Sequence, residues 1–260
     1  MIIIVLLALI LIGFLIVFFI HFITKKRIVN EFKRSNVIVF GKKRKGKDIL
    51  FQCVINARKT KYFSNINYGG KKVLVSPKEV SVSPNTYVNF INNHISIIKK
   101  DKRLEGVDVY LSDGGIILPS QYDSVLHKTF PSLPIAYALS GHLWNNNIHI
   151  NTQNLERVWK ALREQADYFI KIRRRIILPF FIVLFTTEYD KYQSASESLM
   201  PMPSRMLNQY SRAESDKFTA THGFIKNGFI IVRKKSLHYD TRAYHKIIFG
   251  KKAPKKYKKK

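Results

Sequence analysis

The chain has 260 residues, 46% of them hydrophobic, and a formal net charge of +28. This length accommodates one sizeable domain and a short additional segment, and the charge indicates a polyanionic partner, nucleic acid or anionic lipid, unless it reflects a genome-wide preference for lysine. The single cysteine, Cys53, excludes an internal disulfide framework and a cysteine-based zinc site, and it favours a reducing compartment.

The first predicted element is a helix that spans a membrane. Residues 2–23 form an apolar run interrupted only by Gly13 and His21. At about 1.5 Å per residue the run reaches roughly 33 Å, which is enough to cross a hydrocarbon core of about 30 Å. A signal peptide, the competing interpretation, would begin with basic residues, whereas only Met1 precedes this run. Because basic residues 25–27 follow it, we expect the N-terminus outside and the domain in the cytoplasm.

A short β-branched strand is predicted at 37–40, directly before a glycine-bounded loop. The loop consists of Gly41, Lys42, Lys43, Arg44, Lys45, Gly46, Lys47 and Asp48. It fits the Gly-x-x-x-x-Gly-Lys spacing of a phosphate-binding P-loop at every fixed position except the last, where Asp48 replaces the Ser or Thr that contacts magnesium. In such a loop the backbone amides and Lys47 bind nucleotide phosphates, and a carboxylate at position 48 is also a magnesium ligand. A lysine-rich turn between a strand and a helix is the alternative interpretation.

The remaining segments alternate between strand and helix patterns. The predicted helices cover residues 47–57, 87–99, 133–139 and 155–168, of which the last has the clearest amphipathic pattern. Strands are predicted at 72–75, 107–112 and 147–153. The apolar run 176–185 is too short to span a bilayer as a helix and contains Pro179, so it is predicted to form buried strands. This order predicts an α/β fold with a mainly parallel sheet.

Two polar residues that follow predicted strands extend the candidate site. Asp113 comes after the strand at 107–112, where P-loop NTPases place an acid that holds magnesium. Gln153 ends the strand at 147–153, where an amide can orient the attacking water. Gly114 stands where many ATPases carry a water-activating glutamate, and the other carboxylates considered for that role are Glu105, Asp123 and Glu164. Ordinary polar turns after strands are the alternative interpretation of both positions.

Together these segments resemble the Zot-like (zonula occludens toxin) family, the membrane-bound assembly ATPases of filamentous bacteriophages. The resemblance covers roughly residues 36–175, and it rests on the P-loop, Asp113 and the segments 138–143, 151–153 and 158–167. It implies a P-loop ATPase fold of the additional-strand (RecA-like) type, with ATP and Mg²⁺ as cofactors. It also implies a ring-shaped homo-oligomer at the host bacterial inner membrane, which exports and assembles single-stranded phage DNA together with phage coat and assembly proteins.

By position, the resemblance implies a role for each candidate residue. Nucleotide binding falls to the P-loop glycines and Lys47, magnesium to Asp113, and sensing of the γ-phosphate to Gln153. The chain departs from the family at Gly114 and at Gly141-His142, where an acidic residue and an Arg-His pair are usual, and in having its anchor at the N-terminus. Arg163 is the replacement candidate for an arginine that acts in trans.

The expected organisation has five parts. They are a transmembrane anchor at 1–24, a basic juxtamembrane linker at 25–35, a P-loop ATPase-like domain at 36–190, a C-terminal extension at 191–250 and a disordered lysine-rich tail at 251–260. Two functions follow from these features. The first is a membrane-anchored ATPase for virion assembly, and the second is a non-catalytic basic adaptor that tethers DNA or capsid protein to the bilayer.

Overall fold

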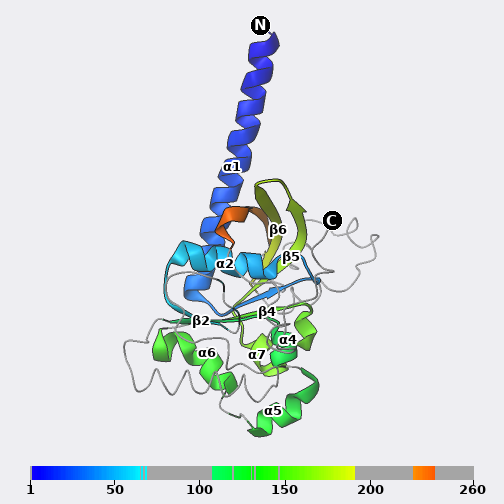
Figure 1. The fold of residues 1–260 in the computed structure, drawn as a ribbon. Helices are drawn as coiled ribbons and strands as arrows, with labels where there is room; N and C mark the ends of the chain where they lie inside the picture. Colours follow the sequence, from blue (N-terminus) through cyan, green and yellow to red (C-terminus); the bar gives the residue numbers. More distant parts are fainter. Residues whose placement is uncertain are drawn as a thin grey trace, which may run out of the picture.

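The computed structural model describes residues 2–64, 66, 68, 107–118, 120–129, 131, 133–145, 147–190 and 225–237. Within them a seven-stranded sheet has the order β2-β3-β4-β1-β5-β6-β7. Strands β1 to β5 run parallel to one another, whereas β6 pairs antiparallel with β5 and β7 pairs antiparallel with β6. Figure 1 shows α2 on one side of the sheet and α4 to α7 on the other. The predicted α/β fold with a mainly parallel sheet is therefore confirmed.

The parallel part of the sheet consists of short, buried strands. They are β1 (Val37–Phe40), β2 (Tyr62–Ser64), β3 (Asp108–Leu111) and β4 (Ile148–Thr152). In β1, Ile38 packs with Trp159 in one hydrophobic core, and Val39 packs with Phe51 in the other. Alternate side chains thus enter opposite layers, which explains why the strand is apolar throughout. Strand β4 lies between β1 and β3, the additional-strand arrangement that the resemblance implies.

Helices connect these strands. They are α2 (Lys47–Arg58), α4 (Gly114–Ile117), η3 (Ser120–Tyr122), α5 (Asp123–Thr129) and α6 (Leu133–Trp144). Helix α2 begins after Gly46, whose backbone is left-handed. Lys59, also left-handed, caps its C-terminus, and the Lys59 amide donates to the Ile55 carbonyl. The predicted helix after the loop is confirmed, and α6 is longer than predicted.

The predicted amphipathic helix at 155–168 is wrong. This segment contains η4 (Leu155–Arg157) and α7 (Lys160–Glu164), and β5 begins at Tyr168. Between the two short helices, the amide of buried Trp159 donates to the Leu118 carbonyl at 2.7 Å. Strand pairing also intervenes, because Tyr168 is in register with Val37 of β1. Tertiary hydrogen bonds therefore override a pattern that favours a helix.

Helix α1 (Ile2–Arg34) continues without a break from the apolar run into the domain. It is long and apolar enough to cross a membrane by length and composition, with a mean hydropathy of 3.6 in its most apolar window. Residues 25–35, predicted as a linker, instead form the last turns of this helix and the residue that follows it. Ile28 and Phe32, four residues apart on one face, are fully buried in the core beside α2. The helix is therefore an integral part of the domain.

Three long strands complete the sheet: β5 (Tyr168–Ile177), β6 (Phe181–Tyr189) and β7 (Ile225–Arg233), which is followed by η5 (Lys234–Ser236). The sheet thus includes a strand from the predicted C-terminal extension. Of the apolar run 176–185, Leu184 is buried but Ile177 and Phe180 are exposed, so the prediction of buried strands holds only in part. The predicted strand at 72–75, the helix at 87–99 and the tail at 251–260 lie outside the described residues.

Candidate nucleotide-binding site

The loop between β1 and α2 requires glycine at both ends. Gly41 and Gly46 have φ angles of +148° and +102°, which other residues rarely adopt. A Cβ atom at Gly41 would lie 2.8 Å from the Ile172 carbonyl oxygen, and one at Gly46 would lie 2.7 Å from a methyl carbon of Leu184. The loop therefore passes directly against β5 and β6. Both glycines of the predicted motif have a steric reason to be glycine.

Lys47 extends back across this loop. Its Nζ donates to the carbonyl oxygens of Gly41 at 3.0 Å and Lys42 at 3.3 Å, and only 6% of the residue is exposed. Burial lowers the pKa of Lys47, while the charges of Asp48 and Asp113 oppose this shift. A buried ammonium group thus lies within the loop, close to two carboxylates. By its charges, such an arrangement can accommodate phosphate oxygens and their counter-ion.

Asp48 joins α2 to the ends of two strands. Its Oδ1 atom accepts hydrogen bonds from the Tyr68 hydroxyl at 2.9 Å, the Ser112 hydroxyl at 2.7 Å and the Asn151 amide at 2.8 Å. Because three donors already occupy this oxygen, Oδ2 is the Asp48 atom that is available to bind magnesium. Sequence reasoning missed Ser112 and Asn151, although both are polar residues at the ends of apolar strands.

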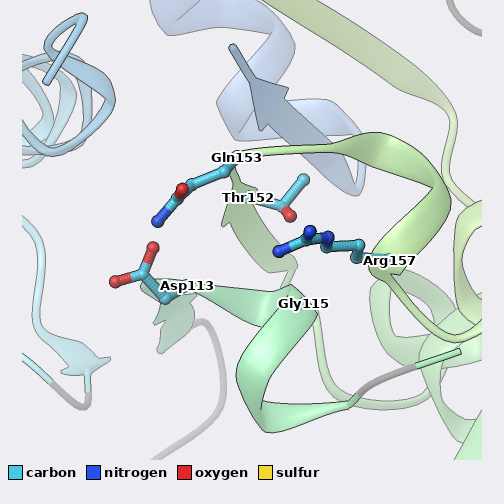
Figure 2. A pocket seen from close by; sticks show the side chains of 5 residues that line it. All are labelled: Asp113, Gly115, Thr152, Gln153 and Arg157. Carbon is cyan, nitrogen blue, oxygen red and sulfur yellow. The ribbon is translucent and has the colours of Figure 1, made fainter. Parts of the chain in front are cut away.

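Asp113 and Gln153 face each other from the ends of β3 and β4. The Asp113 backbone is left-handed, with φ of 56°, and its amide donates to the Asn151 Oδ1 atom at 2.9 Å. The Gln153 side chain points toward the Asp113 carboxylate (Figure 2), and this interaction favours a lower pKa of Asp113. Burial raises the pKa of Asp113, the Asp48 charge adds to this shift, and Lys47 opposes it. The structure thus brings Lys47, Asp48, Asp113 and Gln153 together.

A small pocket of about 50 Å³ adjoins this pair. Its lining residues are Asp113, Gly115, Thr152, Gln153 and Arg157 (Figure 2). This volume has room for only a few water molecules. It therefore suits the reacting end of a ligand rather than a whole nucleotide.

Arg157 is a pocket residue that sequence reasoning missed, because its segment was expected to be a regular helix. It comes from η4, and its side chain extends into the pocket (Figure 2). The predicted Arg163 lies on α7 and does not line this pocket. Asp123 and Glu164 also lie outside the lining, and each has an i,i+4 partner within its own helix. Glu105 is outside the described residues.

Gly114 is closely packed. A Cβ atom there would lie 2.2 Å from the Cγ2 atom of Ile150. A glutamate at this position would therefore require the Ile150 side chain or the start of α4 to shift. The packing at Gly114 thus disfavours a second acid directly after Asp113.

Magnesium fits the donors at this site. The described residues contain no group of three or more His, Cys, Asp or Glu side chains that could hold a metal ion. Mg²⁺, however, is commonly bound by one or two carboxylates together with phosphate oxygens and water. Asp113, with Asp48 beside it, supplies that set. A cation between them would also relieve the repulsion that raises the pKa of Asp113.

Exposed basic residues surround the loop. Lys42, Lys43 and Arg44 are exposed on the loop itself, and Arg173 and Arg174 are exposed on the neighbouring strand β5. The pairing of β5 with β6 shifts register between Ile172 and Arg174, which leaves Arg173 outside the regular ladder. A polyanion thus has a basic surface available next to the candidate site.

No family model and no curated protein matches the sequence. Among solved structures, the genome packaging NTPase from Sulfolobus turreted icosahedral virus 2 in complex with AMP is 16% identical; the alignment covers 80% of this chain and 96% of that chain, with a TM-score of 0.42. The DNA-packaging ATPase from Sulfolobus turreted icosahedral virus is also 16% identical, with 65% and 96% covered and a TM-score of 0.42.

The N-terminal domain of zonular occludens toxin from Neisseria meningitidis is 11% identical to this chain. The alignment covers 82% of this chain and 98% of that domain, with a TM-score of 0.41. A member of the family that the sequence resembles is therefore among its structural neighbours. At these identities a function has to be argued from the residues of the chain itself.

Proposed function

We propose that this chain is a membrane-anchored P-loop ATPase that binds ATP and Mg²⁺ and drives export and assembly of phage single-stranded DNA at the host inner membrane. Nucleotide binding is supported mainly by the position of Lys47, which is buried in a glycine-bounded loop. Asp113 and Gln153, at the carboxyl ends of the neighbouring strands β3 and β4, lie beside this loop. The basic surface beside the loop supports a nucleic-acid partner. Phage coat and assembly proteins, and a ring-shaped homo-oligomer, belong to the proposal through the family resemblance.

Each residue of the site has a proposed task. The loop amides and Lys47 bind the β- and γ-phosphates, because a helix N-terminus and a buried ammonium both favour anions. Asp113 and Asp48 hold Mg²⁺, which neutralises charge on the phosphates when bound. Gln153 orients a water in the small pocket, and Arg157 stabilises charge on the terminal phosphate. Since position 114 has no room for a second acid, we expect slow basal hydrolysis.

The membrane part of the proposal rests on α1. Residues 3–20 and 22–23 are exposed in this structure and apolar except for Gly13. The basic residues that follow favour a cytoplasmic domain and an external N-terminus. Ile28 and Phe32 near the end of α1 pack in the same core as α2, the helix that follows the loop, so the proposed anchor joins the domain directly.

The test is ATP binding and phosphate release by the full chain in lipid nanodiscs, with and without single-stranded DNA. Lys47→Ala should weaken ATP binding roughly 10- to 100-fold, since a hydrogen bond to a charged group contributes about 1.5–3 kcal/mol. Lys128→Ala removes one exposed charge from α5 and serves as the matched control. Unchanged ATP binding and turnover in Lys47→Ala would refute the proposal.

The second candidate is a non-catalytic adaptor that tethers DNA or capsid protein to the bilayer. The closed packing at Gly114 and the net charge of +28 favour it. It predicts DNA binding that weakens steeply with salt and does not respond to ATP. An ATP-dependent change in DNA affinity or in oligomeric state would exclude it.

A further inference from the structure

The β5–β6 hairpin ends in a cluster of exposed apolar side chains. This tip, residues 177–181, has exposed fractions of 56% for Ile177, 44% for Leu178, 75% for Phe180 and 38% for Phe181. A backbone hydrogen bond closes its turn, since the Leu178 amide donates to the Phe181 carbonyl at 2.9 Å. The exposure is therefore a property of a defined turn. Exposed aromatic and aliphatic clusters of this kind mark interaction sites.

The tip extends beyond the parallel sheet. The pairing of β5 with β1 ends at Lys171, opposite Phe40, so no strand among the described residues pairs with the last residues of β5 on that side. On the other side β6 pairs with β7 along its whole length, and Phe181 is in register with Arg233. Figure 1 shows the hairpin rising from the domain beside α1.

Contacts with α1 establish the direction in which the tip points. A Cβ atom at Gly228 of β7 would lie 2.5 Å from the Thr24 hydroxyl oxygen, so the Thr24 side chain packs directly on the Gly228 backbone. Three residues along, the Ile231 amide donates to the His21 Nδ1 atom at 3.1 Å. From Gly228 toward Arg233, β7 therefore runs alongside α1 in the direction of the apolar, N-terminal end of the helix. The tip beside Arg233 lies at or beyond the level of His21.

Basic residues accompany the apolar tip. Arg173, Arg174, Arg233 and Lys235 are exposed on the hairpin and at the end of β7. Long basic side chains near an apolar cluster can place their stems along it and their charges among lipid phosphates. This combination is typical of elements that lie in the interface of an anionic bilayer.

We propose that the hairpin tip inserts into the interface of the same anionic bilayer that α1 spans, as a second membrane contact. This inference rests on the proposed membrane anchoring of α1. Two contacts would prevent the domain from rotating freely about a single helix. They would also hold β5 and β6, which pack against Gly41 and Gly46 of the loop, at a constant height above the lipid.

The test uses single cysteines that carry an environment-sensitive fluorophore, in the full chain with Cys53→Ser, reconstituted in phosphatidylglycerol-rich vesicles. Phe180→Cys reports on the tip, Ile10→Cys on α1, and Val125→Cys, on α5, is the matched control because Val125 is also exposed and apolar, at 56%. We expect lipid-borne quenchers to reduce the fluorescence at positions 10 and 180 several-fold more than at position 125.

Two results separate the inference from the anchoring proposal on which it depends. Quenching at position 10 with water-like behaviour at position 180 refutes the hairpin contact alone. Water-like behaviour at both positions refutes the anchor and the hairpin contact together. In phosphatidylcholine vesicles the contact at position 180 should weaken. In anionic vesicles, Arg233→Ala should reduce the ratio of lipid-bound to water-exposed hairpin tips about fivefold, since one basic residue near such a surface contributes about 1 kcal/mol. If this ratio stays the same in phosphatidylcholine vesicles and in Arg233→Ala, the role of anionic lipid is refuted.

Discussion

The sheet has a parallel end, which carries the candidate site, and an antiparallel end, which carries the hairpin, and the two differ in how they are built. The candidate site lies where short parallel strands end, and its polar side chains are joined to one another by hydrogen bonds around Asp48. The hairpin and β7 form long antiparallel strands that end in an exposed apolar tip and lie against α1. One sheet thus supplies two kinds of surface, a polar one for which we propose phosphate and an apolar one for which we propose lipid.

A partly buried ion pair connects the helix to the antiparallel end. Arg27 donates from Nε to Oε2 of Glu188 at 2.8 Å and from a terminal nitrogen to Oε1 at 2.5 Å, and Tyr168 donates to Oε2 at 2.7 Å. Glu188 is fully buried, and its hydrogen bonds raise the pKa of Arg27. Burial and the Glu188 charge also raise the pKa of the Tyr168 hydroxyl.

The largest expected effect follows from removing one partner of that pair. Glu188→Ala should lower the free energy of unfolding by about 3–5 kcal/mol, because it leaves the Arg27 guanidinium without its partner. Denaturation of the full chain in detergent measures this, with Glu164→Ala, an exposed carboxylate, as the control. If the two ends of the sheet are independent, the folded fraction should retain its ATP affinity. A loss below 1 kcal/mol would show that the pair does not secure α1.

At the site end, Asp48→Ala should lower the free energy of unfolding by about 2–3 kcal/mol, since three donors lose a charged acceptor. Asp48→Asn keeps an oxygen acceptor and should lose less. The same denaturation experiment compares the two variants. Equal losses would mean that the charge at position 48, rather than the accepting atom, stabilises this end of the sheet.

A pH-dependent effect of intermediate size is expected at buried His149 of the parallel strand β4. Burial lowers the pKa of His149 well below its usual value, and the Arg58 charge adds to this shift. As the pH falls below about 6.5, the unfolded chain binds a proton that the folded chain does not, so stability decreases by up to about 1.4 kcal/mol per pH unit.

The measurement is the difference in unfolding free energy between the parent chain and His149→Phe from pH 7 to pH 5. Phenylalanine suits this position because the ring packs between Phe32 and Tyr110, at centroid distances of 4.6 Å and 4.8 Å. Burial raises the pKa of Asp108 to about 6, so this residue makes the folded chain more stable as the pH falls. Because Asp108 is present in both chains, its effect cancels in the difference. A difference that does not change with pH would contradict the buried neutral state of His149.

The smallest effect is expected away from both ends. Lys160 and Glu164 form an exposed pair on α7 with an N–O distance of 3.8 Å. Lys160→Ala should change the free energy of unfolding by no more than about 0.5 kcal/mol. It should leave both ATP binding and the lipid contact of the hairpin unchanged. A larger effect would show that α7 couples to one of the two ends.

The local features of the site could be predicted because they depend on neighbouring residues. The spacing of Gly41, Gly46 and Lys47 predicts the loop, and apolar runs predict the strands that precede Asp113 and Gln153. The roles of Arg157 and Ser112 could not be predicted, because one depends on a short helix and the other on a hydrogen bond to a residue 64 positions away. Arg163, the candidate that the resemblance suggests for an arginine acting in trans, lies on α7 and does not line the small pocket.

By itself, the sequence determined the elements whose pattern is local: the apolar helix, the P-loop and the short strands around it. Only the tertiary structure decided that α1 continues into the core, that β7 joins the sheet and that the segment before Tyr168 is not a regular helix. The physical reason is that these outcomes depend on burial and pairing between distant residues. Asp48 shows both sides, since its place in the motif is visible in the sequence while its three donors become neighbours only on folding.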